Sequence, residues 1–268
     1  MQKIEKNKTD LTDEDLLRYN KHILLPEIDI QGQSELLNKH IVLVGLGGLG
    51  CPVSYYLASS GVGKITIIDK DEIDETNLQR QILYNTNDLG KKKVDVAYEK
   101  MIALNPNIII RKLYMEIDEK VKSNFFQDVD LVIDATDNFK SRNLLNKLTL
   151  KAKKPLIMGA AIKMTGQVSV FRNDLDDMPC YNCLYGGSYD ESVNCLDQGI
   201  LSSLTGIIGS VQATEAIKVL LNIGEILQSK LLVVDVKFSN YKVVKLLKDS
   251  KCNAVSYTHL TLPTICSV

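Results

Sequence analysis

The segment from residue 41 to residue 50 constrains the fold more tightly than any other part of the chain. An apolar, β-branched run at 41–44, IVLV, leads into the glycine-rich turn GLGGLG at 45–50, after which apolar residues recur at helical spacing. This order of strand, glycine turn and helix is the nucleotide-binding fingerprint, in which Gly45, Gly47 and Gly50 serve the turn, the close approach of a phosphate and the helix packing. A second apolar strand ends at Asp69, where a carboxylate can accept a hydrogen bond from a ribose hydroxyl. The sequence therefore predicts an adenosine-nucleotide site.

Alternating apolar strands and helical patterns continue through residues 38–160, which we interpret as the nucleotide-binding core. We expect one domain over residues 1–254, with an α/β, Rossmann-like and mostly parallel sheet that gains an antiparallel extension near the end of the chain. The pattern predicts helices over 13–21, 52–59, 91–104, 118–127, 140–151 and 205–222. It predicts strands over 41–44, 65–69, 108–113, 131–133, 156–158, 167–171, 231–234 and 242–247. We expect loops at 31–33 and 74–89, the latter with a short helix, and an irregular stretch over 172–198.

Length and charge exclude several classes of protein. The chain of 268 residues carries a formal net charge of −1, so no basic excess favours nucleic acid as a partner. The first residues lack the apolar core of a signal peptide, and no uninterrupted apolar run approaches the roughly 20 residues that span a bilayer. We therefore expect a cytoplasmic protein without membrane contact. Its six cysteines then indicate metal or thiol chemistry in preference to disulfides.

A glycine turn alone does not decide which nucleotide binds, but the charged residues around it narrow the choice. Transfer at a phosphorus atom needs fixed positive charge, which Arg80 and Lys93 can supply. The alternative is that lysines 91–93 are only the solvated start of a helix. Asp137 follows a predicted parallel strand and is a candidate magnesium ligand, or else a cap for the helix near residue 140. For Asp134 we expect a structural role.

The cysteines divide into three groups. Cys180 and Cys183 have the spacing of a zinc knuckle, and Cys252 can return to the same site as a third ligand. A second pair at that spacing would need cysteine at position 255, where the chain has Val255, the first residue of a tail (255–268) without Asp, Glu, Lys or Arg that we interpret as non-native. Cys195, in the irregular stretch, is a candidate nucleophile. Cys51 is expected to be a packing residue.

Together, five motifs resemble the ThiF/MoeB/HesA family, bacterial relatives of ubiquitin-activating enzymes. They are RYN at 18–20, GLGGLG at 45–50, NLQRQ at 77–81, TDN at 136–138 and the paired cysteines. The resemblance extends from about residue 11 to residue 252. It implies that ATP and Mg²⁺ adenylylate the C-terminal glycine of a ubiquitin-like sulfur carrier, MoaD-like for molybdopterin or ThiS-like for thiamine thiazole, with release of pyrophosphate.

The resemblance also implies roles for single residues. Gly48 and Asp69 would contact the nucleotide, Asn77, Arg80 and Lys93 the phosphates, Asp137 the magnesium, and the neighbouring Asn138 would belong to the same nucleotide site. Cys195 matches a family cysteine that takes part in sulfur transfer or thioester chemistry in some members, within a crossover loop that embraces the carrier tail. Many relatives carry arginine where Lys21 stands, and that arginine reaches the ATP of the second subunit of a homodimer. Lysine keeps the charge but loses the bidentate fork.

Alternatives remain at this point. No rhodanese-like extension is present, which implies a separate sulfur donor. Residues 159–167 are closer to molybdopterin members of the family, whereas Asn194-Cys195 is similar to thiamine members, and we favour the first pathway. A nicotinamide-dependent oxidoreductase would share the glycine turn but would leave Arg80, Lys93 and Asp137 without a role. A non-catalytic carrier-binding scaffold would keep the zinc knuckle and bind ATP without turnover.

Overall fold

The computed structural model describes residues 11–186, 199–252 and 254. One eight-stranded sheet runs in the order β3-β2-β1-β4-β5-β6-β7-β8, in which the first five strands are parallel and the last three are antiparallel to their neighbours. This confirms the predicted mostly parallel sheet with an antiparallel extension. The strands are β1 (His40–Val44), β2 (Lys64–Asp69), β3 (Ile109–Tyr114), β4 (Leu131–Asp134), β5 (Leu156–Ile162), β6 (Thr165–Phe171), β7 (Lys230–Asp235) and β8 (Asn240–Lys245).

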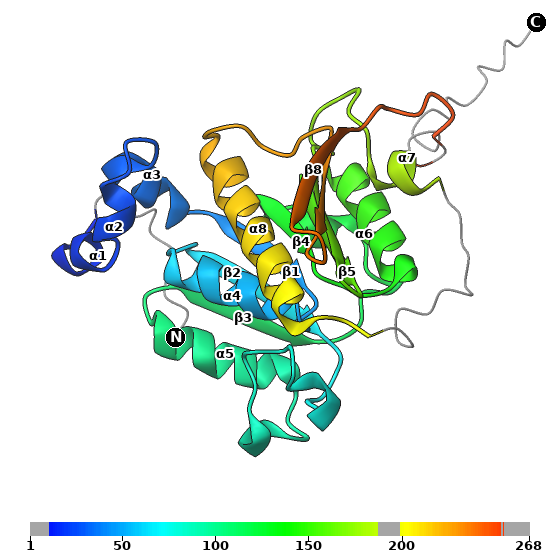
Figure 1. Cartoon of the computed structure of the whole chain (residues 1–268). Helices are drawn as coiled ribbons and strands as arrows, with labels where there is room; N and C mark the ends of the chain where they lie inside the picture. The colour runs from blue at the N-terminus through cyan, green and yellow to red at the C-terminus, as the bar shows by residue number, and fades with distance from the viewer. Residues whose placement is uncertain (1–10, 187–198, 253, 255–268) are drawn as a thin grey trace, which may run out of the picture.

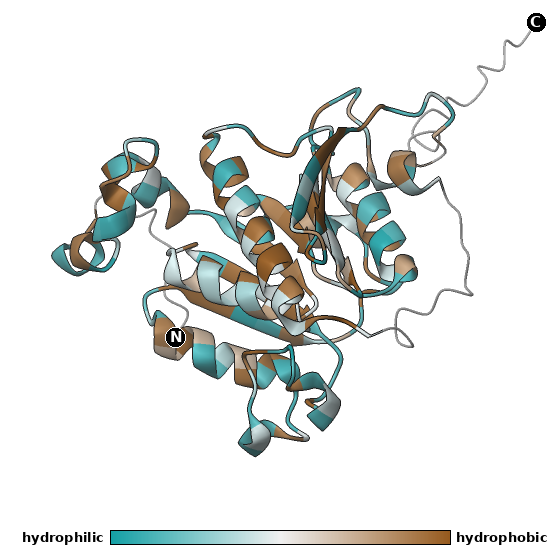
Figure 2. Ribbon diagram, in the orientation of Figure 1, coloured by the Kyte–Doolittle hydropathy of each residue, from teal (hydrophilic) through white to brown (hydrophobic). Residues whose placement is uncertain are grey.

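Helices cover both faces of this sheet and make three layers (Figure 1). Helices α4 (Gly50–Ser59), α5 (Lys93–Leu104) and α8 (Ser202–Leu221) pack on one face, and α6 (Phe139–Ala152), α7 (Tyr181–Tyr185) and the 3₁₀ helix η3 (Ser123–Phe126) lie on the other. Because successive side chains of a strand point to opposite faces, β1 contributes to two separate cores. Ile41 and Leu43 belong to the core under α4 and α8, whereas Val42 and Val44 belong to the core under α6. The central strands are accordingly hydrophobic over most of their length (Figure 2).

The strand order places a topological switch point between β1 and β4, because the chain builds outward from β1 to β3 and then restarts at β4 on the other side. In open α/β sheets, ligands bind at the carboxyl ends of the strands at such a point. The glycine turn after β1 lies at this edge. The fold alone thus directs attention to the residues that follow β1, β2 and β4.

Three short N-terminal helices, α1 (Asp13–Arg18), α2 (Asn20–Ile23) and α3 (Asp29–Leu36), stand at one side of the molecule (Figure 1). They contact the C-terminal ends of α4 and α5: Arg18 donates to the carbonyl oxygen of Leu104 at 3.0 Å, and Gln33 donates to that of Ser60, the C-cap of α4, at 2.9 Å. Since those helices run antiparallel to their strands, α1–α3 lie at the amino end of the parallel strands, opposite the switch-point edge.

Two predicted elements were wrong. The predicted loop at 31–33 is the middle of α3, whose first turn is held by Asp29, since its carboxylate accepts from the backbone N–H of Gln31 at 2.6 Å and of Gly32 at 3.1 Å. The predicted helix over 118–127 is only η3, because the Asp118 carboxylate accepts from the backbone N–H of Lys120 at 2.9 Å and closes a local turn that competes with a helix.

The other predicted elements are confirmed to within a few residues. The expected helix over 13–21 is divided into α1 and α2, and the loop over 74–89 holds two 3₁₀ turns, η1 (Glu75–Asn77) and η2 (Thr86–Asp88). Helix α7 interrupts the stretch expected to be irregular. Helix α8 is long and apolar enough to cross a membrane by length and composition, but half of it is buried in the fold, where it packs on α4, β5 and β6.

Candidate functional site

The glycine turn after β1 brings the backbone closer to its neighbours than any side chain would allow. Gly45 has φ +93°, and a Cβ built on it would lie 2.7 Å from the carbonyl oxygen of Ala135. A Cβ on Gly50 would lie 2.0 Å from the carbonyl oxygen of Gly45, so α4 can start directly against the turn only with glycine there. Gly47 and Gly48 line a cleft at the switch-point edge, whereas Gly50 packs beneath it.

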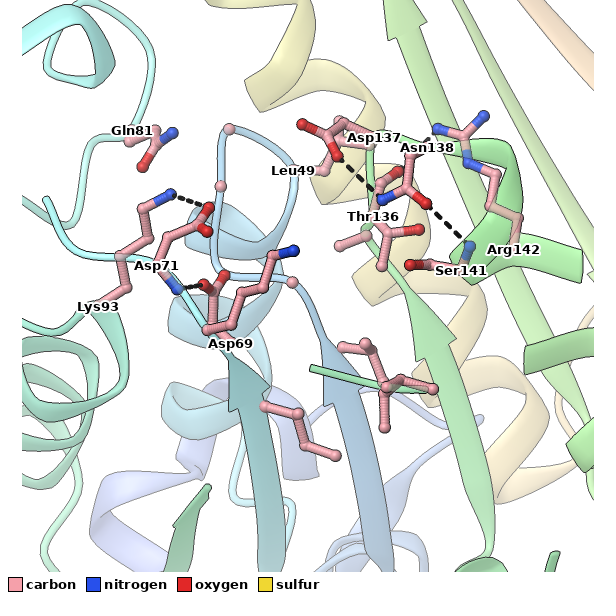
Figure 3. A pocket seen from close by; sticks show the side chains of 18 of the residues that line it. Leu49, Asp69, Asp71, Gln81, Lys93, Thr136, Asp137, Asn138, Ser141 and Arg142 are labelled. Carbon is pink, nitrogen blue, oxygen red and sulfur yellow. Dashed lines mark hydrogen bonds and ion pairs between the residues drawn. The ribbon is translucent and has the colours of Figure 1, made fainter. Parts of the chain in front are cut away.

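The cleft has a cavity volume of about 180 Å³ and opens to solvent. It lies between the ends of β1 and β2 on one side and the segment from β4 into α6 on the other. Figure 3 shows Asp69, Asp71 and Lys93 on one wall facing Asp137, Asn138 and Arg142 on the other. Its lining includes these predicted site residues: Gly45, Gly47, Gly48, Asp69, Arg80, Lys93, Asp137 and Asn138.

Asp69 connects the end of β2 to the glycine turn. Its Oδ2 accepts from the backbone N–H of Leu46 at 2.6 Å and its Oδ1 accepts from that of Asp71 at 2.8 Å. Burial raises the pKa of this carboxyl above its usual range, although Lys93 and the two N–H donors oppose the shift. A carboxylate offers about four acceptor sites, so Asp69 can hold the turn and still accept a hydrogen bond from a hydroxyl group of a ligand.

Arg80 and Lys93, the two cations predicted to bind phosphates, both line the cleft. Lys93 is only 4% exposed, and its Nζ lies 3.0 Å from Oδ2 of Asp71. Arg80 is half-buried and donates to the carbonyl oxygen of Thr76 at 2.9 Å. The interpretation of lysines 91–93 as a solvated helix start is therefore wrong for Lys93, although it describes Lys91, whose side chain is 54% exposed.

The opposite wall separates the roles of two neighbouring residues. Asn138 caps α6, since its Oδ1 accepts from the backbone N–H of Ser141 at 2.8 Å. The cap interpretation of Asp137 is thus wrong, and its exposed carboxylate is available to a cation. Asp134 is fully buried and accepts from the N–H and the hydroxyl of Thr136 at 2.9 and 2.7 Å, which agrees with the structural role expected for it.

The fold leaves other predicted site residues outside the cleft. Asn77 lies in η1 and does not line it. Lys21 is exposed on α2, at the opposite end of the strands. Cys195 lies outside the described residues.

Sequence reasoning missed several residues that line the cleft. Except for Gln81, which lies in the loop after η1, they follow directly on β2 or β3 or lie in the first turn of α6, which is the signal that could have identified them. They are Lys70, Asp71, Gln81, Met115, Glu116, Ile117, Ser141 and Arg142. Lys70 and Glu116 form an ion pair of 3.1 Å at the rim, and Gln81 is 3% exposed with no partner for its Oε1 among the described residues.

A second site of a different kind lies beside α7. The sulfur atoms of Cys180, Cys183 and Cys252 lie within 4.8 Å of one another, with 3.9 Å between the first two and 3.7 Å between Cys180 and Cys252. Zn–S bonds of about 2.3 Å in a tetrahedron put ligand sulfurs about 3.8 Å apart, so these thiols fit a zinc ion. Burial raises the pKa of the Cys180 thiol to about 12, whereas at Cys252 hydrogen bonds from Asn182 and its neighbours outweigh burial and lower the pKa. Cys51 is buried and packs in the core under α4, as expected.

Comparison with known proteins gives concordant results. The family model of the ThiF family matches residues 19–254. The molybdopterin-synthase adenylyltransferase of Escherichia coli (strain K12) is 40% identical over 91% of this chain and 97% of its own length. The adenylyltransferase and sulfurtransferase MOCS3 of Culex quinquefasciatus is 39% identical over 92% of this chain, which spans only 57% of that longer protein.

Solved structures support the fold. The structure of Escherichia coli MccB with ATP matches with a TM-score of 0.74 and 23% identity over 84% of this chain and 69% of that one. The same protein with selenomethionine-labelled MccA matches with a TM-score of 0.77 and 22% identity over 91% of this chain and 74% of that one. The family model, the relatives and the fold agree, and the chain belongs to the ThiF family.

Proposed function

We propose that this protein is a sulfur-carrier adenylyltransferase, which uses ATP to adenylylate the C-terminal glycine of a ubiquitin-like carrier protein and releases pyrophosphate. The observation that carries the proposal is the cleft with Arg80 and Lys93 on one wall and the exposed Asp137 carboxylate on the other. The 40% identity to a molybdopterin-synthase adenylyltransferase over nearly its full length supports the same reaction. It also favours a MoaD-like carrier over a ThiS-like one.

The reaction joins two anions, and the cleft supplies the charges that this requires. A carboxylate oxygen of the carrier attacks the α-phosphorus of ATP, a new C–O–P mixed anhydride forms, and the bond to the departing pyrophosphate breaks. Arg80 and Lys93 would hold the phosphates and stabilise the charge that collects on pyrophosphate. Asp137 would hold Mg²⁺, which adds positive charge on the phosphate oxygens. Gly47 and Gly48 let the phosphates approach the backbone.

Lys93 is prepared for this role by its surroundings. Its ammonium is buried and already oriented by Asp71 at 3.0 Å, so little reorganisation is needed when phosphates arrive. Asp69 would accept a ribose hydroxyl beside it. The side-chain oxygen of Asn138 is used in the α6 cap. Its amide nitrogen, 3.4 Å from Oδ1 of Asp137, would bind the nucleotide or orient that carboxylate.

The remaining parts of the proposal concern the assembly. Lys21 would act at the cleft of a second copy in a homodimer, since it lies at the opposite end of its own strands. Cys180, Cys183 and Cys252 would hold Zn²⁺, and Cys195 would serve sulfur transfer with a separate sulfur-donor protein. We place the enzyme in the cytoplasm, with residues 1–254 as one domain and 255–268 as a non-native tail. Asn77 would reach the phosphates only after η1 moves toward the cleft.

Two alternatives are less well supported. A nicotinamide-dependent oxidoreductase would leave the buried Lys93 and the nearby Arg80 of the cleft without a role in the reaction. A carrier-binding scaffold without turnover would not need the magnesium position at Asp137.

The test is ATP–pyrophosphate exchange with a MoaD-like and a ThiS-like carrier, each supplied in turn. Exchange that depends on one carrier and is lost in Arg80→Ala would establish the reaction and identify the carrier. Arg111→Ala is the matched control, because this exposed arginine on β3 does not line the cleft. A folded protein that binds ATP but supports no exchange with either carrier, even after Val255→Cys restores a second cysteine pair, would contradict the proposal.

A further inference from the structure

Helix α6 lies between the nucleotide cleft and the thiol cluster and contacts both. Its first turn carries Ser141 and Arg142, which line the cleft. One turn further along the same helix, Asn146 lies against Cys180 of the thiol cluster. Arg142 is 7% exposed and Asn146 is 1% exposed, so both side chains are held by packing on the inner side of α6.

The side chain of Asn146 connects to the thiol cluster by two bonds. Its amide nitrogen donates to Sγ of Cys180 at 3.6 Å, and its carbonyl oxygen accepts from the backbone N–H of Tyr181 at 3.2 Å. The buried Asn173 steadies this arrangement, since its amide lies 3.4 Å from the same carbonyl oxygen and donates to the Thr149 hydroxyl at 2.9 Å. Outer partners of this kind orient a metal ligand.

Arg142 is positioned by the same helix pair. Its Nη2 donates to the carbonyl oxygen of Thr136 at 2.7 Å, and its guanidinium carbon lies 5.9 Å from the centre of the Phe139 ring. That ring packs edge-on against Tyr185 of α7 at 6.4 Å, and Tyr185 in turn lies 4.7 Å from the Tyr181 ring. The cleft wall therefore rests on α7.

Helix α7 is too short to be stable by itself and depends on its packing against the rest of the fold. It has five residues, far fewer than the roughly 12–15 at which an isolated helix becomes even marginally stable. Its start and its middle carry Cys180 and Cys183, and Cys252 comes from the far end of the chain. A metal ion bound by all three sulfurs would join α7 to the segment after β8 and so hold α7 in place against α6.

We infer that Asn146 is a positioning residue that couples metal binding at the thiol cluster to nucleotide binding in the cleft. The hydrogen bond from Asn146 to Cys180 links the position of this metal ligand to the position of α6. The packing of α6 on α7 in turn determines where Arg142 and the cleft wall lie. Linkage makes the effect reciprocal: metal raises the affinity for nucleotide, and nucleotide raises the affinity for metal by the same factor. The inference rests on the proposed function, because it requires that a nucleotide occupies the cleft.

The first measurement is the affinity of the full chain for Mg²⁺ and a non-hydrolysable ATP analogue, by calorimetry, with Zn²⁺ bound and after its removal by a chelator. We expect nucleotide affinity to fall about fivefold or more without zinc, the lower end of typical coupling between sites. Zinc affinity, measured by chelator competition, should rise by the same factor when the analogue is present. Neither readout depends on catalysis.

The second measurement uses Asn146→Ala. We expect zinc affinity without nucleotide to fall about 10- to 100-fold, as for other losses of an outer partner, and nucleotide affinity to lose most of its dependence on zinc. Lys147→Ala is the control, since this exposed residue lies next to Asn146 on the same helix but belongs neither to the thiol cluster nor to the cleft lining. It should change neither quantity. The wild-type comparison needs no variant and stands even if Asn146→Ala fails to fold.

The outcomes separate this inference from the proposed function. Loss of all ATP-analogue binding in the zinc-loaded wild type would refute the proposed function and the coupling together. Binding that is equal with and without zinc in folded protein would overturn the coupling alone. Failure of Zn²⁺ to bind the chain would also overturn it.

Discussion

Lys93→Met is the substitution that best separates a catalytic role of this lysine from a structural one. Methionine keeps the unbranched, flexible shape of the side chain, is one atom shorter, and removes the charge together with its hydrogen-bond donors. Lys93 is 4% exposed, and the carboxylate that it contacts, Asp71, is 54% exposed in its side chain. The ion pair thus has one buried and one solvated partner.

The expected effects on stability and activity differ in size. An ion pair with a solvated partner contributes about 0–1 kcal/mol, and replacing a buried charge by a well-packed apolar side chain is often neutral or stabilising. We expect the free energy of unfolding to stay within about 1 kcal/mol of the wild type. Activity should fall about 10²- to 10³-fold in kcat, as for other losses of one preorganised group that stabilises developing charge.

The assay is ATP–pyrophosphate exchange with the carrier, combined with urea unfolding of the same preparations. Lys91→Met is the control, because Lys91 lies two residues before Lys93, contacts the carboxylate of Asp88 at 3.1 Å and does not line the cleft. It should leave exchange unchanged. Exchange at the wild-type rate in Lys93→Met, or a loss of exchange explained by a large drop in stability, would refute the reasoning.

Three further predictions follow from the geometry. Gly50→Ala puts a Cβ 2.0 Å from the carbonyl oxygen of Gly45 and should destabilise the fold by several kcal/mol in urea unfolding. Gly206→Ala adds a Cβ that would meet no atom of the described residues within 4 Å apart from the nearby backbone of α8, so it should be neutral or stabilising by up to about 1 kcal/mol. Asp137→Asn should raise the Mg²⁺ concentration needed for exchange and leave stability unchanged, while Asn138→Ala should cost about 1 kcal/mol of unfolding free energy through loss of the α6 cap. Burial raises the pKa of Cys51 to about 12, so this thiol stays protonated at pH 8 and should resist iodoacetamide in the folded protein; its contribution to stability is complete below the unfolded thiol pKa near 9 and is lost as the pH rises toward 12. Rapid labelling of Cys51 in folded protein would contradict the burial argument.

Local patterns in the sequence predicted most of the sheet and the helices around it. Runs of β-branched residues mark strands buried on both faces, and the glycine turn needs the backbone freedom that only glycine provides at positions such as Gly45. The two wrong elements depended on short-range hydrogen bonds of aspartate side chains. The Asp29 carboxylate stabilises the first turn of α3, whereas that of Asp118 closes a turn where a helix was expected.

The candidate site was predicted as a set of residue types, and the fold decided which of them meet. Lysines 91–93 are indistinguishable in the sequence, yet only Lys93 is turned inward beside the cleft. The place of Arg142 near the start of α6 was a weak signal, because its position in the wall also depends on α6 packing against α7.

The sequence by itself determined the α/β pattern, the nucleotide fingerprint and the family, because these depend on residue type and spacing over a few tens of residues. Only the tertiary structure decided that Lys93 and Asp137 line the same cleft, and that Cys252 returns to within 3.7 Å of Cys180. Such outcomes depend on the crossing of elements far apart in the chain, and burial and charge at a site follow from that packing.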